Sequence, residues 1–223
     1  MLRYLSLYLL ALGFAACAHA EDSKAVSDDD ATGYYRPGAA IPATADLSRG
    51  DVPRDSYGRP FTYEGLGEKL PVFSGPLAEG ASFASSTLEG RWTVIEVWGI
   101  WCHDSRHDAP YAAALSRALA QDADVDFMSI HTPPSADHVD IALRGYESVP
   151  AWFDEQGWSF PTLLDEDASI RTALRIRWTP TYLVVAPDLT VQGFRTGLAD
   201  AGDLAVKSFV QDIAETRRSW EGS

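Results

Sequence analysis

A continuous apolar segment that leads directly into a helix constrains the fold of this chain more than any other feature. The segment Trp92–Trp98 follows a turn at Leu88–Arg91 and has the length of a buried strand. Helical periodicity begins at Cys102 and continues to about Gln121, with Pro110 expected to kink the helix. The sequence therefore predicts a strand followed by a helix, with Cys102 at the junction.

Further strands and helices alternate along the chain. The patterns predict strands at Val125–Ile130, Ser159–Leu164, Thr181–Ala186 and Thr190–Phe194, and helices at His138–Gln156, Ala168–Ile176 and Ala201–Arg217. The last two strands flank a turn at Pro187–Asp188, so we expect them to pair antiparallel. This order predicts an α/β fold with a central mixed sheet flanked by helices.

Length and composition indicate one domain with an appendage. The chain has 223 residues, 46% hydrophobic and 22% charged, whereas a single domain usually contains about 100–150 residues. This composition excludes a wholly disordered or collagen-like protein. Residues 21–69 are rich in Asp, Ala, Gly, Pro and Ser and lack apolar periodicity. We therefore expect a flexible N-terminal extension over 21–69 and one domain over 70–223.

The first twenty residues have the layout of a secretory signal peptide. Arg3 precedes the apolar run Leu5–Ala16, which is too short to span a bilayer. Cleavage after Ala18-His19-Ala20 would give a soluble product, whereas Phe14-Ala15-Ala16-Cys17 resembles a bacterial lipobox. We expect a signal peptide over 1–20 and export to the bacterial periplasm, either in soluble form or with a lipid anchor at Cys17.

Charge and cysteine content limit the possible partners and chemistry. The formal net charge is −14, which disfavours nucleic acid and anionic lipid because both need a surplus of positive charge. The chain has two cysteines, and removal or lipidation of Cys17 would leave Cys102 as the free thiol. A cysteine at the first turn of a helix favours the thiolate form. No cofactor is predicted.

Two motifs resemble the thioredoxin superfamily. The string Glu96–Arg106 is similar to its active-site strand and helix, with an aromatic pair before the cysteine, and Trp178–Thr181 resembles its cis-proline loop. Leu70–Phe73, Phe160–Asp165 and the extra helix after the second strand resemble the exported TlpA/ResA-like branch. The resemblance covers about Leu70–Val210 and implies a thioredoxin-like fold with an extra helical insertion.

The resemblance also implies roles for individual residues. Cys102 corresponds to the nucleophile of a redox-active centre, and Glu96 to a buried acid that relays protons. Trp101 is a candidate for contact with the substrate, and Thr179 and Pro180 match the loop that pairs with the substrate backbone. An alternative for Glu96 is an exposed carboxylate on an edge strand.

One position departs from the family pattern. Ser105 stands where the second cysteine of Cys-x-x-Cys is expected, and a serine cannot resolve a mixed disulfide. Ser105 could instead donate a hydrogen bond to the Cys102 thiolate. The resemblance thus implies a monothiol thiol-disulfide oxidoreductase or isomerase that acts on protein disulfides or mixed disulfides and relies on an external reductant.

Other functions remain as alternatives. A non-catalytic thioredoxin-like module could bind a protein partner or copper through the same surface. Cys102, His103 and His107 do not have the spacing of a convincing metal site, so none is predicted, and His131 and His138 are expected at the surface or in loops. The peroxidatic Pro-x-x-x-Thr-x-x-Cys pattern is absent before Cys102.

Overall fold

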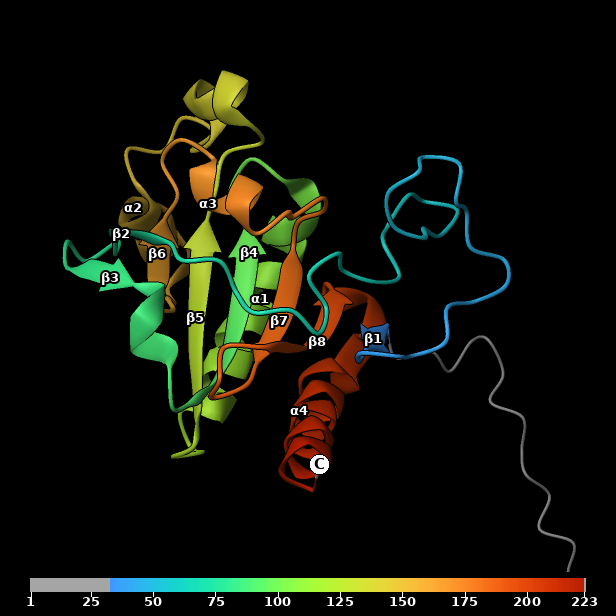
Figure 1. Cartoon of the computed structure of the whole chain (residues 1–223). Coiled ribbons are helices and arrows are strands. Elements are labelled where there is room, and N and C mark those ends of the chain that lie inside the picture. The colour runs from blue at the N-terminus through green and yellow to red at the C-terminus, as the bar shows by residue number, and fades with distance from the viewer. Residues whose placement is uncertain (1–32, 223) are drawn as a thin grey trace, which may run out of the picture. The chain divides into compact units, whose positions relative to one another are not determined.

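A six-stranded mixed sheet forms the centre of the structure. The computed structural model describes residues 33–222, so the predicted signal peptide and Cys17 lie outside the described residues. The strands in spatial order are β1 (Tyr34–Tyr35), β8 (Val191–Thr196), β7 (Thr181–Val185), β4 (Trp92–Trp98), β5 (Val125–His131) and β6 (Thr162–Leu164) (Figure 1). β4, β5 and β6 are parallel, whereas β1, β7 and β8 pair antiparallel with their neighbours.

Within residues 33–222, four α-helices accompany the sheet. They are α1 (His103–Leu119), α2 (Val149–Gln156), α3 (Ser169–Ala173) and α4 (Ala205–Glu221), with 3-10 helices at Ser85–Leu88, Ala136–Ile141 and Ala199–Leu204 and a hairpin of β2 (Ser74–Pro76) and β3 (Ser82–Ala84). Among the described residues, no helix is long and apolar enough to cross a membrane. The predicted mixed sheet flanked by helices is confirmed.

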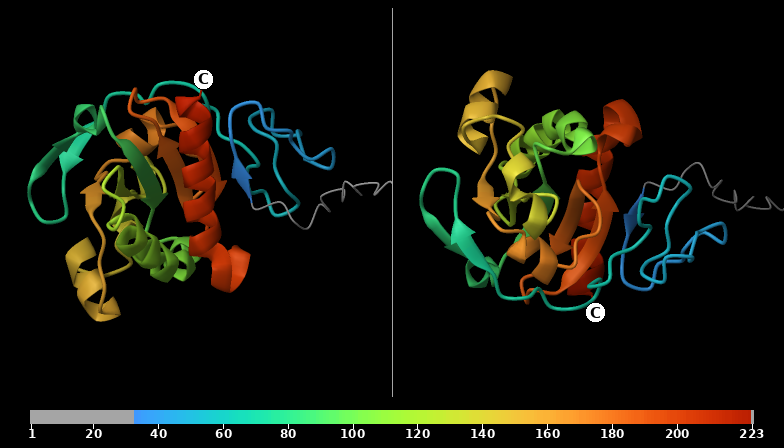
Figure 2. Two further views of the ribbon diagram at one scale, coloured as in Figure 1. Left: turned by 90° about the horizontal axis from the view of Figure 1, so that it is seen from below. Right: turned by 90° about the horizontal axis from the view of Figure 1, so that it is seen from above.

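Alternation along β4 supplies side chains to two cores. Val94 and Trp98 join α1, α2 and α4 on one face of the sheet, whereas Ile95 and Val97 join α3 on the other. All four side chains are fully buried. Figure 2 shows α1 and α4 beside one another, in agreement with their contacts. This two-sided burial explains why β4 is apolar along its length.

The helix predicted over His138–Gln156 is broken. The structure has the 3-10 helix Ala136–Ile141, then a loop in which Gly145 has a φ of 89°, and α2 starts only at Val149. The Ser148 side chain accepts a hydrogen bond from Ala151 N at 3.2 Å, and a proline occupies the first turn. Both features are typical of the first residues of a helix. A new helix therefore begins at Val149, within the range predicted as one helix.

The predicted flexible extension differs from the structure over residues 33–69. There β1 pairs with β8 and becomes the edge strand of the sheet, and Gly67 N donates a hydrogen bond to Val191 O at 2.8 Å. The Tyr63 ring stacks on Phe194 at 6.1 Å, and its hydroxyl donates to Leu174 O at 2.7 Å. Scattered aromatic residues therefore attach a segment that has the composition of a linker. Figure 2 shows it alongside β8.

Truncation of Tyr63 tests whether this segment contributes to stability. Tyr63 is 7% exposed, and we expect Tyr63→Ala to lower the free energy of unfolding by about 3 kcal/mol, because a buried aromatic ring leaves a cavity. Urea unfolding measures the change. Tyr57→Ala is the control, because Tyr57 is 80% exposed and should change stability by less than about 0.5 kcal/mol. Equal, small effects would show that the segment does not stabilise the domain.

Candidate active site

Cys102 lies where β4 passes into α1. It is the N-cap residue of α1, with φ −83° and ψ 129°, and its backbone N donates a hydrogen bond to Gly99 O at 3.0 Å. The side chain is half-buried, and its Sγ donates to Thr179 O at 3.3 Å. The unpaired N–H groups of the first turn of α1 favour negative charge near this position. Cys102 is the free cysteine among the described residues.

The loop before β7 forms the other side of this contact. The Thr179–Pro180 peptide bond is cis, and both residues are buried. β7 begins directly after the proline and pairs antiparallel with β4, with Val97 opposite Thr181. This register places the end of β4 beside the start of β7. The structure thus brings together three of the residues singled out in the sequence, Cys102, Thr179 and Pro180.

Ser105 does not form the predicted hydrogen bond with Cys102. Its side chain is fully buried, and its Oγ accepts a hydrogen bond from Gly99 N at 3.3 Å. Among the hydrogen bonds of residues 33–222, none joins Ser105 to the sulfur. Ser105 is the third residue of α1, so its side chain can turn back to the preceding loop, as a capping side chain does. Its contact holds the Gly99–Cys102 turn.

Trp101 is fixed from two sides. Its Nε1 donates to Thr132 O at 2.7 Å, and the Arg171 guanidinium lies over its ring, 5.6 Å from the centroid. Gly99 permits this arrangement, because a Cβ at that position would lie 2.8 Å from Thr132 O and collide with the indole. The ring is half-buried, so part of it remains available for contact beside Cys102.

Glu96 is fully buried on the central strand β4, not exposed on an edge strand. The Tyr182 hydroxyl oxygen lies 3.3 Å from Glu96 Oε1 and 2.6 Å from Asp108 Oδ2. Glu96 Oε2 has no hydrogen-bond partner among the described residues. Burial, reinforced by the nearby charge of Asp108, raises the pKa of Glu96 well above its usual value.

The number of protons available identifies which of the two carboxyl groups, Glu96 or Asp108, is charged. One hydroxyl carries one proton, so Tyr182 can bridge two carboxyl groups only if one of them is protonated. Asp108 is the better anion, because its Oδ1 accepts from Leu198 N at 2.5 Å and Ala199 N at 2.6 Å. Glu96 is then the neutral acid, which agrees with its raised pKa. The arrangement forms a chain from the Glu96 carboxyl through Tyr182 to the Asp108 carboxylate.

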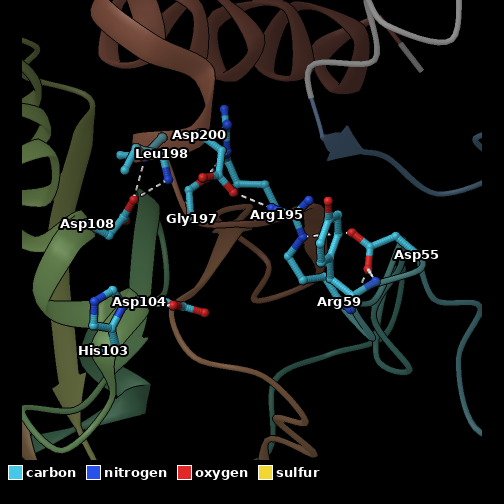
Figure 3. Close-up of polar contacts among 11 residues, drawn as sticks. Asp55, Arg59, His103, Asp104, Asp108, Arg195, Gly197, Leu198 and Asp200 are labelled. Atoms are coloured by element: carbon cyan, nitrogen blue, oxygen red, sulfur yellow. Dashed lines mark hydrogen bonds and ion pairs between the residues drawn. The ribbon is translucent and has the colours of Figure 1, made fainter.

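A cleft of about 440 Å³ opens beside Asp108, at the end of this series of hydrogen bonds. It is lined by Tyr57, Arg59, Asp104, His107, Asp108, Trp178, Pro180, Thr196, Gly197, Ala199 and Asp200. Figure 3 shows Asp108 reaching from α1 toward Leu198, and Arg59 between Asp55 and Asp200. The 33–69 segment thus contributes one wall of a cleft whose opposite wall is the first turns of α1.

The histidines divide into buried and exposed. His131 is 4% exposed, contrary to the expectation of a surface position, and its Nε2 accepts a hydrogen bond from Ile100 N at 3.2 Å. Burial lowers the pKa of His131 to about 4, so the ring is neutral. His103 and His107 are exposed. Among the described residues, no three His, Cys, Asp or Glu side chains are grouped to hold a metal ion.

Comparison with known proteins places the chain in a family. The model of the AhpC/TSA family matches residues 66–194, which contain both Cys102 and the cis-proline loop. The chain belongs to the AhpC/TSA family. The thiol-disulfide oxidoreductase ResA of Bacillus subtilis is 24% identical over 131 residues, 59% of this chain and 67% of that protein. ResA of Bacillus anthracis is 23% identical over 123 residues, 55% and 65%.

Solved structures agree on the fold of this AhpC/TSA-family chain. A Neisseria meningitidis protein proposed to be a thioredoxin has a TM-score of 0.53 and 19% identity, covering 69% of this chain and 93% of its own. A Bacteroides thetaiotaomicron protein proposed to be a protein disulfide isomerase has a TM-score of 0.52 and 23% identity, covering 67% and 88%. The predicted thioredoxin-like fold and the resemblance to the ResA-like branch are confirmed. The chain spans about two thirds of the length of the ResA relatives.

Three residues near the candidate site were not singled out by the sequence analysis. Asp108 carried a detectable signal, because it follows Ser105 by three positions on the buried face of α1, where a carboxyl needs a partner. Tyr182 and Arg171 carried none, because their partners are distant in sequence.

The charge state of Glu96 predicts a pH dependence of stability. The unfolded chain releases the Glu96 proton above a pKa of about 4.3, whereas the folded chain retains it. Stability should therefore fall as pH rises above that value. We expect Glu96→Gln to flatten the profile by up to about 1.4 kcal/mol per pH unit, measured by urea unfolding at several pH values. Glu89→Gln, at an exposed position, is the control, and parallel profiles for the parent and Glu96→Gln would contradict a neutral Glu96.

Proposed function

We propose that the protein is an exported monothiol thiol-disulfide oxidoreductase or isomerase with Cys102 as its nucleophile. The observation that carries the proposal is the half-buried Cys102 thiol at the start of α1, in contact with the Thr179 carbonyl before Pro180. The sulfur is accessible, lies where helix N–H groups favour negative charge, and adjoins a backbone that can align an extended substrate. The names of the ResA relatives agree with this chemistry.

The reaction proceeds by two thiol-disulfide exchanges. The Cys102 thiolate attacks one sulfur of a substrate disulfide, forms a mixed disulfide with it, and expels the other sulfur as a thiolate. An external thiolate, or a second thiolate of the substrate, then attacks the substrate sulfur of the mixed disulfide and releases Cys102 as a thiolate. In the reductive cycle a second external thiolate then displaces the first from the substrate, so two external thiols become a disulfide and the substrate gains two electrons, whereas isomerisation transfers none.

The surrounding residues support these steps. Ser105 holds the Gly99 end of the turn that presents the sulfur, and Trp101 offers an aromatic surface beside it. The Glu96 carboxyl is the candidate proton donor for the departing thiolate, and the hydrogen-bonded chain to Asp108 leads toward the cleft.

Export and the substrate class complete the proposal. The charged and apolar pattern of residues 1–20 supports export to the periplasm, either in soluble form or anchored at Cys17. Protein disulfides or mixed disulfides are the proposed substrates. The second candidate is a non-catalytic binding module on the same scaffold, favoured by the serine at position 105.

A single-turnover assay distinguishes the two candidates. In a chain carrying Cys17→Ser, Cys102 is the sole thiol, and we expect it to release one thiolate per chain from a chromogenic aromatic disulfide. At slightly acidic pH the folded chain should react at least about tenfold faster than the urea-unfolded chain, because the N–H groups at the start of α1 favour negative charge on the attacking sulfur. Cys102→Ser should release none. A folded thiol that is no faster than the unfolded one would support the binding module.

The lifetime of the mixed disulfide tests the monothiol mechanism. With Ser105 present, we expect the adduct formed with a cysteine peptide disulfide to persist until an external thiol is added. Ser105→Cys should release the peptide without added thiol, because it supplies a resolving sulfur. Mass spectrometry follows both species, and Ser105→Ala is the control for loss of the Gly99 contact. Rapid spontaneous release in the parent chain would contradict the mechanism.

A further inference from the structure

Arg171 is a half-buried cation on the element that packs against Trp101, next to the proposed nucleophile. It lies in the short helix α3, and all its guanidinium hydrogen bonds go to neutral carbonyl groups. Nη1 donates to Pro133 O at 3.0 Å and to Pro134 O at 2.7 Å, and Nε donates to Ile176 O at 3.3 Å. These bonds orient the guanidinium without neutralising its charge.

No carboxylate is paired with this guanidinium among the described residues. The nearest candidate, Asp165, is already engaged: its oxygens accept from Ile170 N at 3.0 Å, Arg171 N at 2.9 Å and Thr132 Oγ1 at 2.9 Å. Asp165 therefore binds the Arg171 backbone and not its side chain. A half-buried charge without a direct counter-ion is partly desolvated, so negative charge nearby stabilises it.

The Cys102 thiol is the candidate for that partner. The guanidinium lies over the ring of Trp101, the residue next to Cys102, at 5.6 Å from the ring centroid. Burial lowers the pKa of Arg171, and negative charge on Cys102 and then on Asp165 opposes this shift. Negative charge on Cys102 therefore favours the charged form of Arg171.

We propose that Arg171 supplies the positive charge that stabilises the Cys102 thiolate, which makes it a positioning residue for both exchange steps. The inference rests on the proposed function. The thiolate is the attacking group in the first step and the leaving group in the second, so one fixed cation assists both. In a chain with Ser105 at the resolving position, this cation supplies stabilisation that Ser105 does not.

Other charged groups around Cys102 contribute less. Those on α1 and before the cis-proline loop are His103, Asp104, Arg106, His107 and Arg177. The side chains of His103 and Asp104 are 85% and 56% exposed, and Arg177 is 55% exposed and pairs with Glu64. Water and salt screen exposed charges of this kind.

The remaining groups near the start of α1 have partners that account for them. Arg106 donates to Ile100 O at 2.7 Å, and it is the one other cation that could compete for the role. On the α1 face of the sheet, Glu96 is neutral and the Asp108 carboxylate is bound by Tyr182 and by backbone N–H groups. Arg106 and Arg171 both bind neutral carbonyl groups, and of the two it is Arg171 on which the charge of Cys102 acts.

The test measures the pH dependence of Cys102 alkylation by iodoacetamide in the full chain carrying Cys17→Ser. Arg171→Gln keeps hydrogen-bond donors but removes the charge, and Arg171→Met keeps only the packing on Trp101. Each should raise the midpoint of the profile and slow alkylation at slightly acidic pH by about tenfold, the effect of one nearby charge. Arg171→Lys keeps the charge and should stay within about threefold of the parent.

Two further variants serve as comparisons. Arg175→Met removes an exposed arginine that pairs with Glu68 and should leave the profile unchanged. Arg106→Gln should shift the midpoint less than Arg171→Gln does. Cooperative urea unfolding shows which variants fold, and either neutral variant at position 171 is sufficient for the test.

The outcomes separate this inference from the proposed function. An unchanged midpoint in a folded neutral variant, or a larger shift from Arg106→Gln, overturns the role of Arg171 even if the parent exchanges disulfides. A parent chain that fails to exchange disulfides overturns the proposed function, whatever the midpoint. A raised midpoint that Arg171→Lys restores, with parallel loss and recovery of exchange rate, supports both.

Discussion

The contact between Cys102 Sγ and Thr179 O is the interaction on which the site depends. It requires β4 and β7 to be neighbours in the sheet, because β4 delivers the cysteine and β7 begins directly after Pro180. The antiparallel register places the two ends side by side, and the two apolar cores hold it in place. A one-residue slip of β7 would turn its alternating side chains to the wrong faces and misplace the loop. The position of one sulfur thus reflects the packing of the whole sheet.

The same register creates the buried acid pair. Glu96 and Tyr182 are opposite residues on β4 and β7, and Asp108 reaches the hydroxyl from α1. Two carboxyl groups around one hydroxyl would repel each other if both were charged, so the fold keeps one proton in the group. Asp108 also binds the backbone at 198–199. The network therefore links the strand below Cys102 to the cleft beside it.

Local patterns predicted much of the fold, and long-range contacts account for what they missed. The strand Trp92–Trp98 was predicted with the bounds that it has, because burial on both faces leaves a continuous apolar run. The 33–69 segment was not recognised, since its aromatic anchors are scattered among linker-like residues. Tyr182 meets its acids 74 and 86 positions away, and no local periodicity encodes such a contact. Cys102, Thr179 and Pro180 could be proposed from the sequence because each lies in a short, contiguous motif.

The absence of a second cysteine at position 105 changes what the surroundings must do. In a two-cysteine centre the second sulfur can resolve the mixed disulfide. The first thiolate must therefore be a good attacking group, and its adduct with the substrate is short-lived. In the proposed monothiol reaction, the external thiol must reach the adduct, and Cys102 must also be a good leaving group. A half-buried sulfur meets the first need, and the role proposed for Arg171 would meet the second without a bond to the sulfur. Ser105 turned toward Gly99 and Arg171 held by carbonyl groups are consistent with that division of roles.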